Sequence, residues 1–273
     1  MKIGCATRRF CEQTEENTWA VLKEAGIEYV DGGLGEDGAD GLDDQLMETL
    51  RGDFGAAGIK IWFVHAPFVN PYEISSPDSA KVELAIDAIL ACVKGCKALG
   101  GEGVVMHGSE HIKEPETAGS HMPRAKEALK RIVEYAAPLG VTIAIENLPP
   151  GYLGCRSSEL LELTDPYDVD QLGICLDTGH ANLSGGEGVD LIKDVAPLMV
   201  TTHLHDNDST GDQHQLPGVG TINWDDVARA LVATKYTGPV MFETAVSDSF
   251  EEMVRQMPDI ATDLVARLRS ARG

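Results

Sequence analysis

The sequence predicts an α/β fold, in which a single (β/α)8 TIM barrel of parallel strands carries an active site at its C-terminal face. Three observations support this prediction. Short apolar segments alternate with helical patterns eight times along the chain. Most of these segments lack polar–apolar alternation, as expected for parallel strands that are buried on both faces. The length of 273 residues, 43% of them hydrophobic, suits one barrel domain over residues 1–273.

The strand candidates are short apolar runs bounded by turn residues or helical patterns. In chain order they are Lys2–Ala6, Tyr29–Gly32, Lys60–Ala66, Gly103–His107, Thr142–Glu146, Leu172–Asp177, Val200–His205 and Pro239–Glu243. Glycines cluster after the second strand, and the first turn has no GxGxxG pattern. We therefore interpret the glycine-rich stretch as a loop and not as a dinucleotide-binding turn.

Helical periodicity is clearest in four segments, which are Ala80–Leu99, Arg124–Ala137, Trp224–Ala233 and Phe250–Leu268. Asn223 precedes the third segment and Asp226 lies in its first turn, so Asn223 is expected to cap that helix. Pro258 has no backbone N–H and is expected to kink or restart the last helix. No linker or change of composition indicates a second domain.

The chain is strongly acidic. It contains 44 acidic residues against 22 Lys and Arg, which gives a net charge of −22 and a pI near 4.6. Nucleic-acid binding depends on clustered basic residues, so we expect no nucleic-acid partner. High net charge is also a general means of staying soluble, so it identifies no function by itself.

Several features predict a cytoplasmic protein without a membrane partner. No apolar run reaches the length of a membrane span, and the N-terminal residues Met1–Gly4 show no charged and apolar leader. The six cysteines are scattered and form no CxxC pair. Cys92 and Cys96 lie within a helical pattern, so buried thiols are the better interpretation.

From the third strand onward, every predicted strand ends in a residue that can bind a metal ion. These residues are His65, His107, Glu146, Asp177, His203 and Glu243, and the loops after the sixth and seventh strands add His180, Asp212 and His214. In a barrel, all these strand ends meet at one face. A single histidine there is more often a hydrogen-bonded core residue than a ligand. Six consecutive strand ends of the same character indicate a functional cluster.

The types of side chain indicate the metal. Mixed imidazole and carboxylate ligands favour Zn2+, Mn2+, Co2+ or Fe2+, whereas an all-oxygen set would favour Mg2+ or Ca2+. No cysteine is among the candidates, so a structural zinc site is not expected. The sequence therefore predicts a divalent metal centre of one to three ions, with Zn2+ and Mn2+ as the leading candidates.

Three motifs resemble the xylose-isomerase-like barrel superfamily, which contains sugar isomerases and epimerases and the endonuclease IV type of DNA-repair enzyme. They are Asp177-Thr178-Gly179-His180, then His203-Leu204-His205-Asp206-Asn207, and Asp212-Gln213-His214-Gln215-Leu216-Pro217-Gly218-Val219-Gly220 followed by Ile222-Asn223-Trp224. The motifs run from His65 to Glu243 in the order typical of the family. The resemblance therefore covers nearly the whole chain.

Resemblance to the ketose epimerase branch implies one Mn2+ or similar ion, held by Glu146, Asp177, His203 and Glu243. Glu146 and Glu243 would be the catalytic acid and base on opposite faces of the sugar carbon, with an enediolate between the two proton transfers. His180 would contact the substrate. The chain has Tyr152 and Ser209 where that branch carries a Glu and an Arg. These departures argue against a ketohexose 3-epimerase in the strict sense.

Resemblance to the endonuclease IV branch implies three zinc ions. The first would be held by His65, His107 and Glu146, the second by Glu146, Asp177, His203 and Glu243, and the third by His180, Asp212 and His214. A hydroxide between the ions would attack a phosphodiester. All nine ligands have a counterpart here, which favours more than one ion.

The leading hypothesis is a sugar or sugar-phosphate isomerase or epimerase that transfers protons between two metal-bound glutamates. A small sugar needs only a compact pocket, and the loops after the strands contain few basic residues for gripping DNA. Trp62, Phe68 and Tyr152 are candidates for the apolar walls of that pocket, although packing beneath the loops explains each equally well. His205 is a further candidate substrate contact.

Two other hypotheses remain at this stage. One is an endonuclease IV-like phosphodiesterase that acts on an abasic site or a small phosphoester. The other is a metal-holding scaffold without chemistry of its own, which suits paired carboxylates less well. A homo-oligomer is compatible with the sequence, since related isomerases often form dimers or tetramers.

Overall fold

The computed structural model describes residues 2–9, 18–34, 44–113, 116–245 and 249–273. Its eight parallel strands form one sheet in the order β7-β6-β5-β4-β3-β2-β1-β8. They are β1 (Ile3–Arg9), β2 (Tyr29–Gly33), β3 (Lys60–His65), β4 (Gly103–Met106), β5 (Thr142–Glu146), β6 (Leu172–Asp177), β7 (Met199–His203) and β8 (Val240–Phe242). The sheet curves into a nearly closed barrel, which confirms the predicted fold class.

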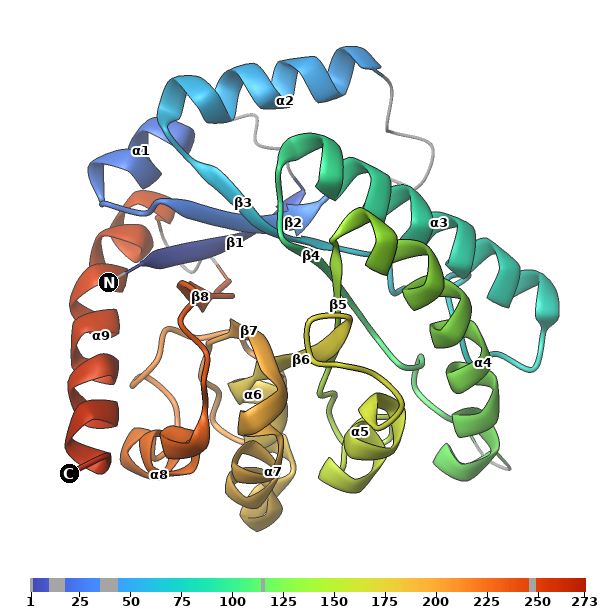
Figure 1. Ribbon diagram of the computed structural model, residues 1–273. Coiled ribbons are helices and arrows are strands. Elements are labelled where there is room, and N and C mark those ends of the chain that lie inside the picture. The colour runs from blue at the N-terminus through green and yellow to red at the C-terminus, as the bar shows by residue number, and fades with distance from the viewer. Residues whose placement is uncertain (1, 10–17, 35–43, 114–115, 246–248) are drawn as a thin grey trace.

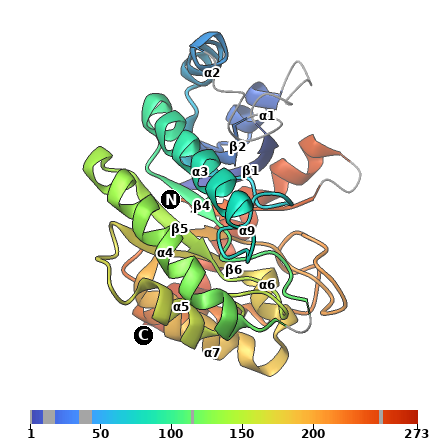
Figure 2. The ribbon, with the colours of Figure 1, turned by 90° about the vertical axis from the view of Figure 1, so that its right-hand side faces the viewer.

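Helices follow the strands and surround the barrel (Figure 1). They are α1 (Thr18–Glu24), α2 (Asp44–Ala57), α3 (Ser79–Leu99), α4 (Ala118–Ala136), α5 (Ser157–Thr164), α6 (Thr178–Leu183), α7 (Gly188–Val195), α8 (Trp224–Ala230) and α9 (Phe250–Ala271). The turned view shows α3 and α4 packed beside each other on the outside of the strands (Figure 2). None of the helices within the described ranges is long and apolar enough to span a membrane.

The barrel closes at a seam between β7 and β8. The backbone N–H of Leu204 donates to the carbonyl oxygen of Met241 at 2.9 Å, and that of Glu243 donates to the oxygen of Leu204 at 3.2 Å. A bridge pairs Leu204 with Phe242. All the other neighbouring strands share longer ladders, such as the four register pairs between β4 and β5. The seam is thus a short join, and metal-ligand candidates stand on both of its sides.

Apolar side chains fill two regions. Inside the barrel, Phe63, Val105, Ala144 and Cys175 pack together. A larger core lies between the strands and the surrounding helices, where α3 buries Ile86 with its neighbours on the same face. This packing makes the strand backbone a rigid support for the side chains at its C-terminal ends.

Sequence signals explain several helix boundaries. The Asp78 side chain accepts a hydrogen bond from the N–H of Ala80 at 2.9 Å, and α3 ends at Leu99, directly before Gly100, whose φ of 78° favours glycine. Asn223 accepts from the N–H groups of Asp225 and Asp226, which confirms the predicted cap of α8. These two helices begin within one residue of their predicted starts.

Two helices differ from the prediction at or near a proline. Helix α4 begins at Ala118 and not at Arg124, because the N–H of Thr117 donates to the Oγ of Ser120 at 3.1 Å and starts the helix before Pro123. Helix α9 does not restart at Pro258 but continues through it. Buried side chains on both sides of the proline hold α9 against the barrel and outweigh the lost hydrogen bond.

Several strand candidates were slightly long at their C-terminal ends, whereas β1 extends three residues beyond the candidate Lys2–Ala6. His107, His205 and Glu243 follow their strands by one or two residues, and Ala66 lies outside β3. Of the six cysteines, the five described are free thiols, and Cys92 and Cys96 are buried as expected. Cys11 lies outside the described residues.

Candidate metal centre

The polar strand ends converge at the C-terminal face of the barrel, as the sequence predicts. The parallel register contributes to this convergence, since Asp177 and His203 are direct partners in the ladder between β6 and β7. Within the described residues, five groups of donor atoms come within 4.8 Å of one another, one of which includes Cys175, and three of the five contain all nine predicted ligands. These three are His65, His107 and Glu146, then Glu146, Asp177, His203 and Glu243, and finally His180, His205, Asp212 and His214.

Glu146 joins the first two groups. Its Oε2 lies 3.3 Å from the Nε2 of His65 and 3.1 Å from the Nε2 of His107, while its Oε1 lies 3.0 Å from the Nδ1 of His203. The residue is 1% exposed. Burial raises the pKa of Glu146, but the charge of His203 and the hydrogen bonds from the three imidazoles outweigh it and hold the pKa well below its usual range. Glu146 is therefore an ionised ligand candidate.

The second group surrounds His203, which is fully buried. Its Nδ1 also lies 3.2 Å from the Oε2 of Glu243. Burial lowers the pKa of His203, but the surrounding carboxylates outweigh burial and raise it well above the usual value. Burial raises the pKa of Glu243, but the charge and hydrogen bond of His203 lower it to about 2. Without a cation, a protonated imidazole thus balances these acids.

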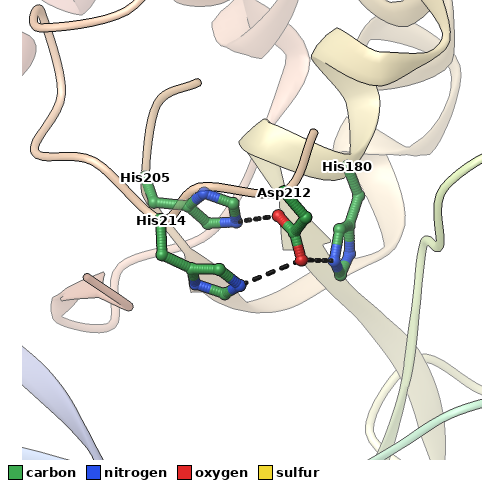
Figure 3. Close-up of side chains that lie close together, drawn as sticks. All are labelled: His180, His205, Asp212 and His214. Atoms are coloured by element: carbon green, nitrogen blue, oxygen red, sulfur yellow. Dashed lines mark hydrogen bonds and ion pairs between the residues drawn. The ribbon is translucent and has the colours of Figure 1, made fainter. Parts of the chain in front are cut away.

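The third group is shown in Figure 3. Asp212 lies between His214 and His180, with its Oδ2 at 3.0 Å from the Nε2 of His214 and 3.3 Å from the Nε2 of His180. The rings of His205 and His214 are stacked, with their centroids 4.0 Å apart. Burial lowers the pKa of His180, but the charge of Asp177 and the hydrogen bond with Asp212 raise it to about 10.

Three of the histidines have one ring nitrogen tied to the backbone. The Nδ1 of His65 lies 2.8 Å from the oxygen of Ala66, that of His180 2.9 Å from the oxygen of Asn147, and that of His214 2.9 Å from the oxygen of Glu243. A backbone oxygen accepts only, so each Nδ1 carries a proton. When the ring is neutral, its lone pair is therefore on Nε2, the nitrogen that faces the centre. This arrangement is the one that metal-binding imidazoles need.

The donor sets fit divalent cations that accept mixed nitrogen and oxygen ligands, such as Zn2+ or Mn2+. Glu146 and Asp177 are buried, and within the described residues their ion-pair partners are all histidines. Imidazole can give up its proton to a metal ion, whereas Lys or Arg could not be displaced in this way. The centre is therefore suited to exchange protons for cations.

Two cavities open beside the centre. The larger, of about 720 Å3, lies between the ends of β1, β2, β3 and β8 and the loop after β3, and the smaller, of about 350 Å3, is lined by residues that include His107, Glu146, Tyr152, His180 and Asp212. Phe68 and Glu243 line both cavities. Among the described lining residues, Lys113 is the one lysine or arginine.

The four predicted substrate contacts have different positions. Phe68 stacks on the ring of His107 with 4.3 Å between centroids, and Tyr152 lines the smaller cavity. Trp62 lines neither cavity but packs in the barrel interior against Tyr29 and Tyr236, so its position does not support a substrate contact. It lies three residues before the end of β3, roughly 10 Å lower along the strand.

His205 lies inside the third group instead of facing an open cavity. Its Nε2 lies 2.9 Å from the Oδ2 of Asp177, and the residue is fully buried. Gly179 leaves room for the ring, because a Cβ at this position would lie 1.9 Å from the Cε1 atom of His205. Prediction of His205 as a substrate contact is therefore not supported by its position.

Sequence reasoning missed Asp31 and Asp206. Asp31 lies in the predicted strand Tyr29–Gly32 and directly follows its apolar residues, but the argument from strand ends was applied only from the third strand onward. Burial raises the pKa of Asp31, and the hydrogen bond and charge of His203 oppose that rise. Asp206 lies in the same loop as Asp212, and its carboxylate accepts hydrogen bonds from four N–H groups.

Comparison with known proteins gives consistent relatives. The family described as "Xylose isomerase-like TIM barrel" matches residues 19–271. An uncharacterized protein of Methanocaldococcus jannaschii is 31% identical over 216 residues, covering 74% of this chain and 72% of that protein. A ketose 3-epimerase of Arthrobacter globiformis is 26% identical, covering 89% and 83%. A probable endonuclease 4 of Methanoculleus marisnigri is 30% identical, covering 70% and 72%.

Solved structures share the fold. A D-tagatose 3-epimerase-like protein superimposes with a TM-score of 0.83 at 23% identity, over 100% of both chains. The IOLI protein, solved with a bound zinc atom, superimposes with a TM-score of 0.82 at 18% identity, over 98% of this chain and 99% of that one. At these identities, the likeness extends to the barrel architecture and no further.

Proposed function

The chain belongs to the xylose isomerase-like TIM barrel family, and on that basis we propose that it is a metal-dependent isomerase or epimerase of a sugar or sugar phosphate. The observation that carries the proposal is the pair Glu146 and Glu243, which share one donor group with Asp177 and His203. Both glutamates line the 350 Å3 cavity. Two carboxylates beside one small cavity suit proton transfer to and from carbon.

The proposed reaction uses the two glutamates in turn. A divalent cation in the second group would polarise the carbonyl and neighbouring hydroxyl of the sugar. Glu146 or Glu243 removes the proton from the adjacent carbon, and the other returns a proton from the opposite face, so the sugar passes through an enediolate. His180 lines the same cavity and holds its Nδ1 on the backbone, which leaves its Nε2 to contact a substrate oxygen or an ion.

Solvent exchange into a sugar tests this proposal. The protein, loaded with Mn2+ or Zn2+, is incubated in D2O with ketoses and ketose phosphates, and NMR follows deuterium at the carbons beside the carbonyl. Glu146→Gln and Glu243→Gln should each reduce exchange by about 10² to 10⁴, whereas Glu162→Gln on the outside of α5 should not. Wild-type protein that binds metal but exchanges no proton with any of these sugars would exclude the isomerase.

One observation favours a second candidate, a phosphodiesterase of the endonuclease IV type. Its three predicted ion sites all correspond to donor groups, and a relative is named probable endonuclease 4. The net charge of −22 and the single lysine lining the cavities argue against binding of duplex DNA. Metal analysis that finds about three zinc ions per chain, together with cleavage of a duplex containing an abasic site, would favour this candidate.

A further inference from the structure

Asp31 is a buried carboxylate in the middle of β2. It is 1% exposed, and its Oδ2 lies 3.4 Å from the Nε2 of His203, on β7. Its Oδ1 has no hydrogen-bond partner within the described residues, and the ion pair with His203 is the one recorded for its carboxylate there. Burial of a carboxylate with so few partners lowers the stability of the folded protein, which suggests that the residue is retained for a function.

The ring of His203 is turned the opposite way from those of the other histidines described above. Its Nδ1 faces the oxygens of Glu146 and Glu243 at 3.0 and 3.2 Å, so Nδ1 is the atom that could reach a cation. In His65, His180 and His214, a backbone oxygen holds the proton on the nitrogen that faces away from the centre. The corresponding nitrogen of His203 faces Asp31.

We propose that Asp31 is a positioning residue that holds the proton of His203 on Nε2 and thereby leaves the Nδ1 lone pair to a divalent cation. The inference rests on the metal site of the proposed function but not on the sugar reaction. The Asp31 carboxylate accepts the imidazole proton of His203, as backbone oxygens do for His65, His180 and His214. It also places a negative charge next to the ring nitrogen that faces away from the cation. Carboxylates behind metal-bound imidazoles commonly change metal affinity by about 10- to 100-fold.

Metal affinity tests the proposal directly. The dissociation constants of Zn2+ and Mn2+ are measured for wild type, Asp31→Asn and Asp31→Ala by competition with a chromophoric chelator. Both substitutions should weaken binding by about 10- to 100-fold. The matched control is Thr201→Val, which changes a buried polar group of β7 two residues before His203 and should leave the affinity unchanged.

A second measurement separates positioning from folding. Urea unfolding of the metal-free proteins should show Asp31→Asn to be at least as stable as wild type, because it removes a buried charge next to other carboxylates. Long-range 1H–15N NMR of the zinc-loaded wild type should show His203 protonated at Nε2 and bound to zinc through Nδ1, and a ring bound to zinc through Nε2 would overturn the proposal.

The outcomes distinguish this inference from the proposed function. Unchanged affinity in Asp31→Asn, or a loss of affinity explained by unfolding of the metal-free variant, overturns the inference. Wild type that binds neither cation overturns both it and the metal site. Wild type that binds metal and depends on Asp31, yet exchanges no proton with any sugar, supports the inference while the isomerase fails.

Discussion

At the scale of single residues, protonated histidines supply in the metal-free protein the positive charge that a bound metal ion would supply. Asp212, for example, is held between His180 and His214, and its pKa is strongly lowered because their hydrogen bonds and charges outweigh burial. Asp212 is therefore ionised, and His180 and His214, whose pKa values are raised to about 10 and about 9, are the groups that lose their charge as the pH rises. Both the stability of the metal-free protein and its affinity for cations depend on the same protons.

The metal-free protein should lose stability as the pH rises from about 6.5 to about 10. Burial lowers the pKa of His214, but the hydrogen bond with Asp212 and the charge of Glu243 raise it to about 9, and His180 reaches about 10. A group whose pKa is raised on folding stabilises fully below its unfolded pKa, and this contribution disappears as the pH passes the folded pKa.

Thermal melting of EDTA-treated protein across this range measures the decline. Zinc-loaded protein is the control and should show no decline, because bound metal needs unprotonated imidazoles. A melting temperature of the metal-free protein that stays constant or rises from pH 6.5 to 10 would contradict the charge arrangement described here.

Phe68→Ala should raise KM for the substrate about tenfold, which corresponds to about 1.4 kcal/mol of lost apolar contact. The unfolding free energy should change by less than about 1 kcal/mol, because the side chain is 44% exposed. Steady-state kinetics and urea unfolding measure the two quantities. Trp62→Phe is the control, since Trp62 lies away from both cavities, and it should leave KM unchanged. An unchanged KM in Phe68→Ala would remove Phe68 from the substrate site.

The sequence could predict the ligand candidates because strand ends meet at one face in any barrel. It could not predict depth along a strand, which separates Trp62 from His65, since both belong to the same apolar run. It also could not predict which ring nitrogen of His203 faces the acids. Asp31 was within reach of the same argument, since it directly follows the apolar residues Tyr29 and Val30 of the second predicted strand.

At the scale of elements, Asp206 fixes the conformation of the loop between β7 and α8 through its hydrogen bonds. The carboxylate is fully buried and accepts hydrogen bonds from the N–H groups of Asn207, Gly218 and Ile222 and from the Nε1 of Trp224. Within this loop, His214 has a φ of 49°, which costs a non-glycine residue about 1 kcal/mol. The loop therefore holds a mildly strained ligand in place.

Asp206→Asn should lower the unfolding free energy by about 2 kcal/mol or more, because the amide nitrogen faces N–H donors and leaves them without an acceptor. It should also weaken cation binding by the third group, whose Asp212 and His214 are in this loop. Urea unfolding and zinc titration measure these effects. Asp87→Asn, exposed on α3 and away from this loop, is the control and should change neither. Equal stability of the two variants would show that the buried hydrogen bonds contribute little.

Element boundaries were predictable where a capping residue marks them, as at Asp78 and Asn223. They were not predictable where tertiary packing overrides a local signal. Pro123 and Pro258 both lie inside helices whose buried faces pack on their surroundings. The short helices α6 and α7 lack the length over which a helical period becomes clear.

At the scale of the whole molecule, the acidic surface and the metal centre both favour the binding of cations. A net charge of −22 attracts cations and repels polyanions, and Debye screening limits that effect to roughly 8 Å at physiological salt. The charge thus favours entry of divalent ions and disfavours long nucleic acids, but it does not distinguish a neutral sugar from a monophosphate.

The seam between β7 and β8 gives the metal a second consequence, in the dynamics of the barrel. His203 ends β7 and Glu243 follows β8, so a cation held by both would fasten the join that few backbone hydrogen bonds close. Local opening at the seam should therefore be slower in the loaded protein. Hydrogen–deuterium exchange should show the amides of Leu204 and Glu243 to be more protected with zinc than without it, whereas amides of β4 and β5 should differ little. Equal protection at the seam in both states would mean that the ion does not stabilise the pairing of β7 with β8.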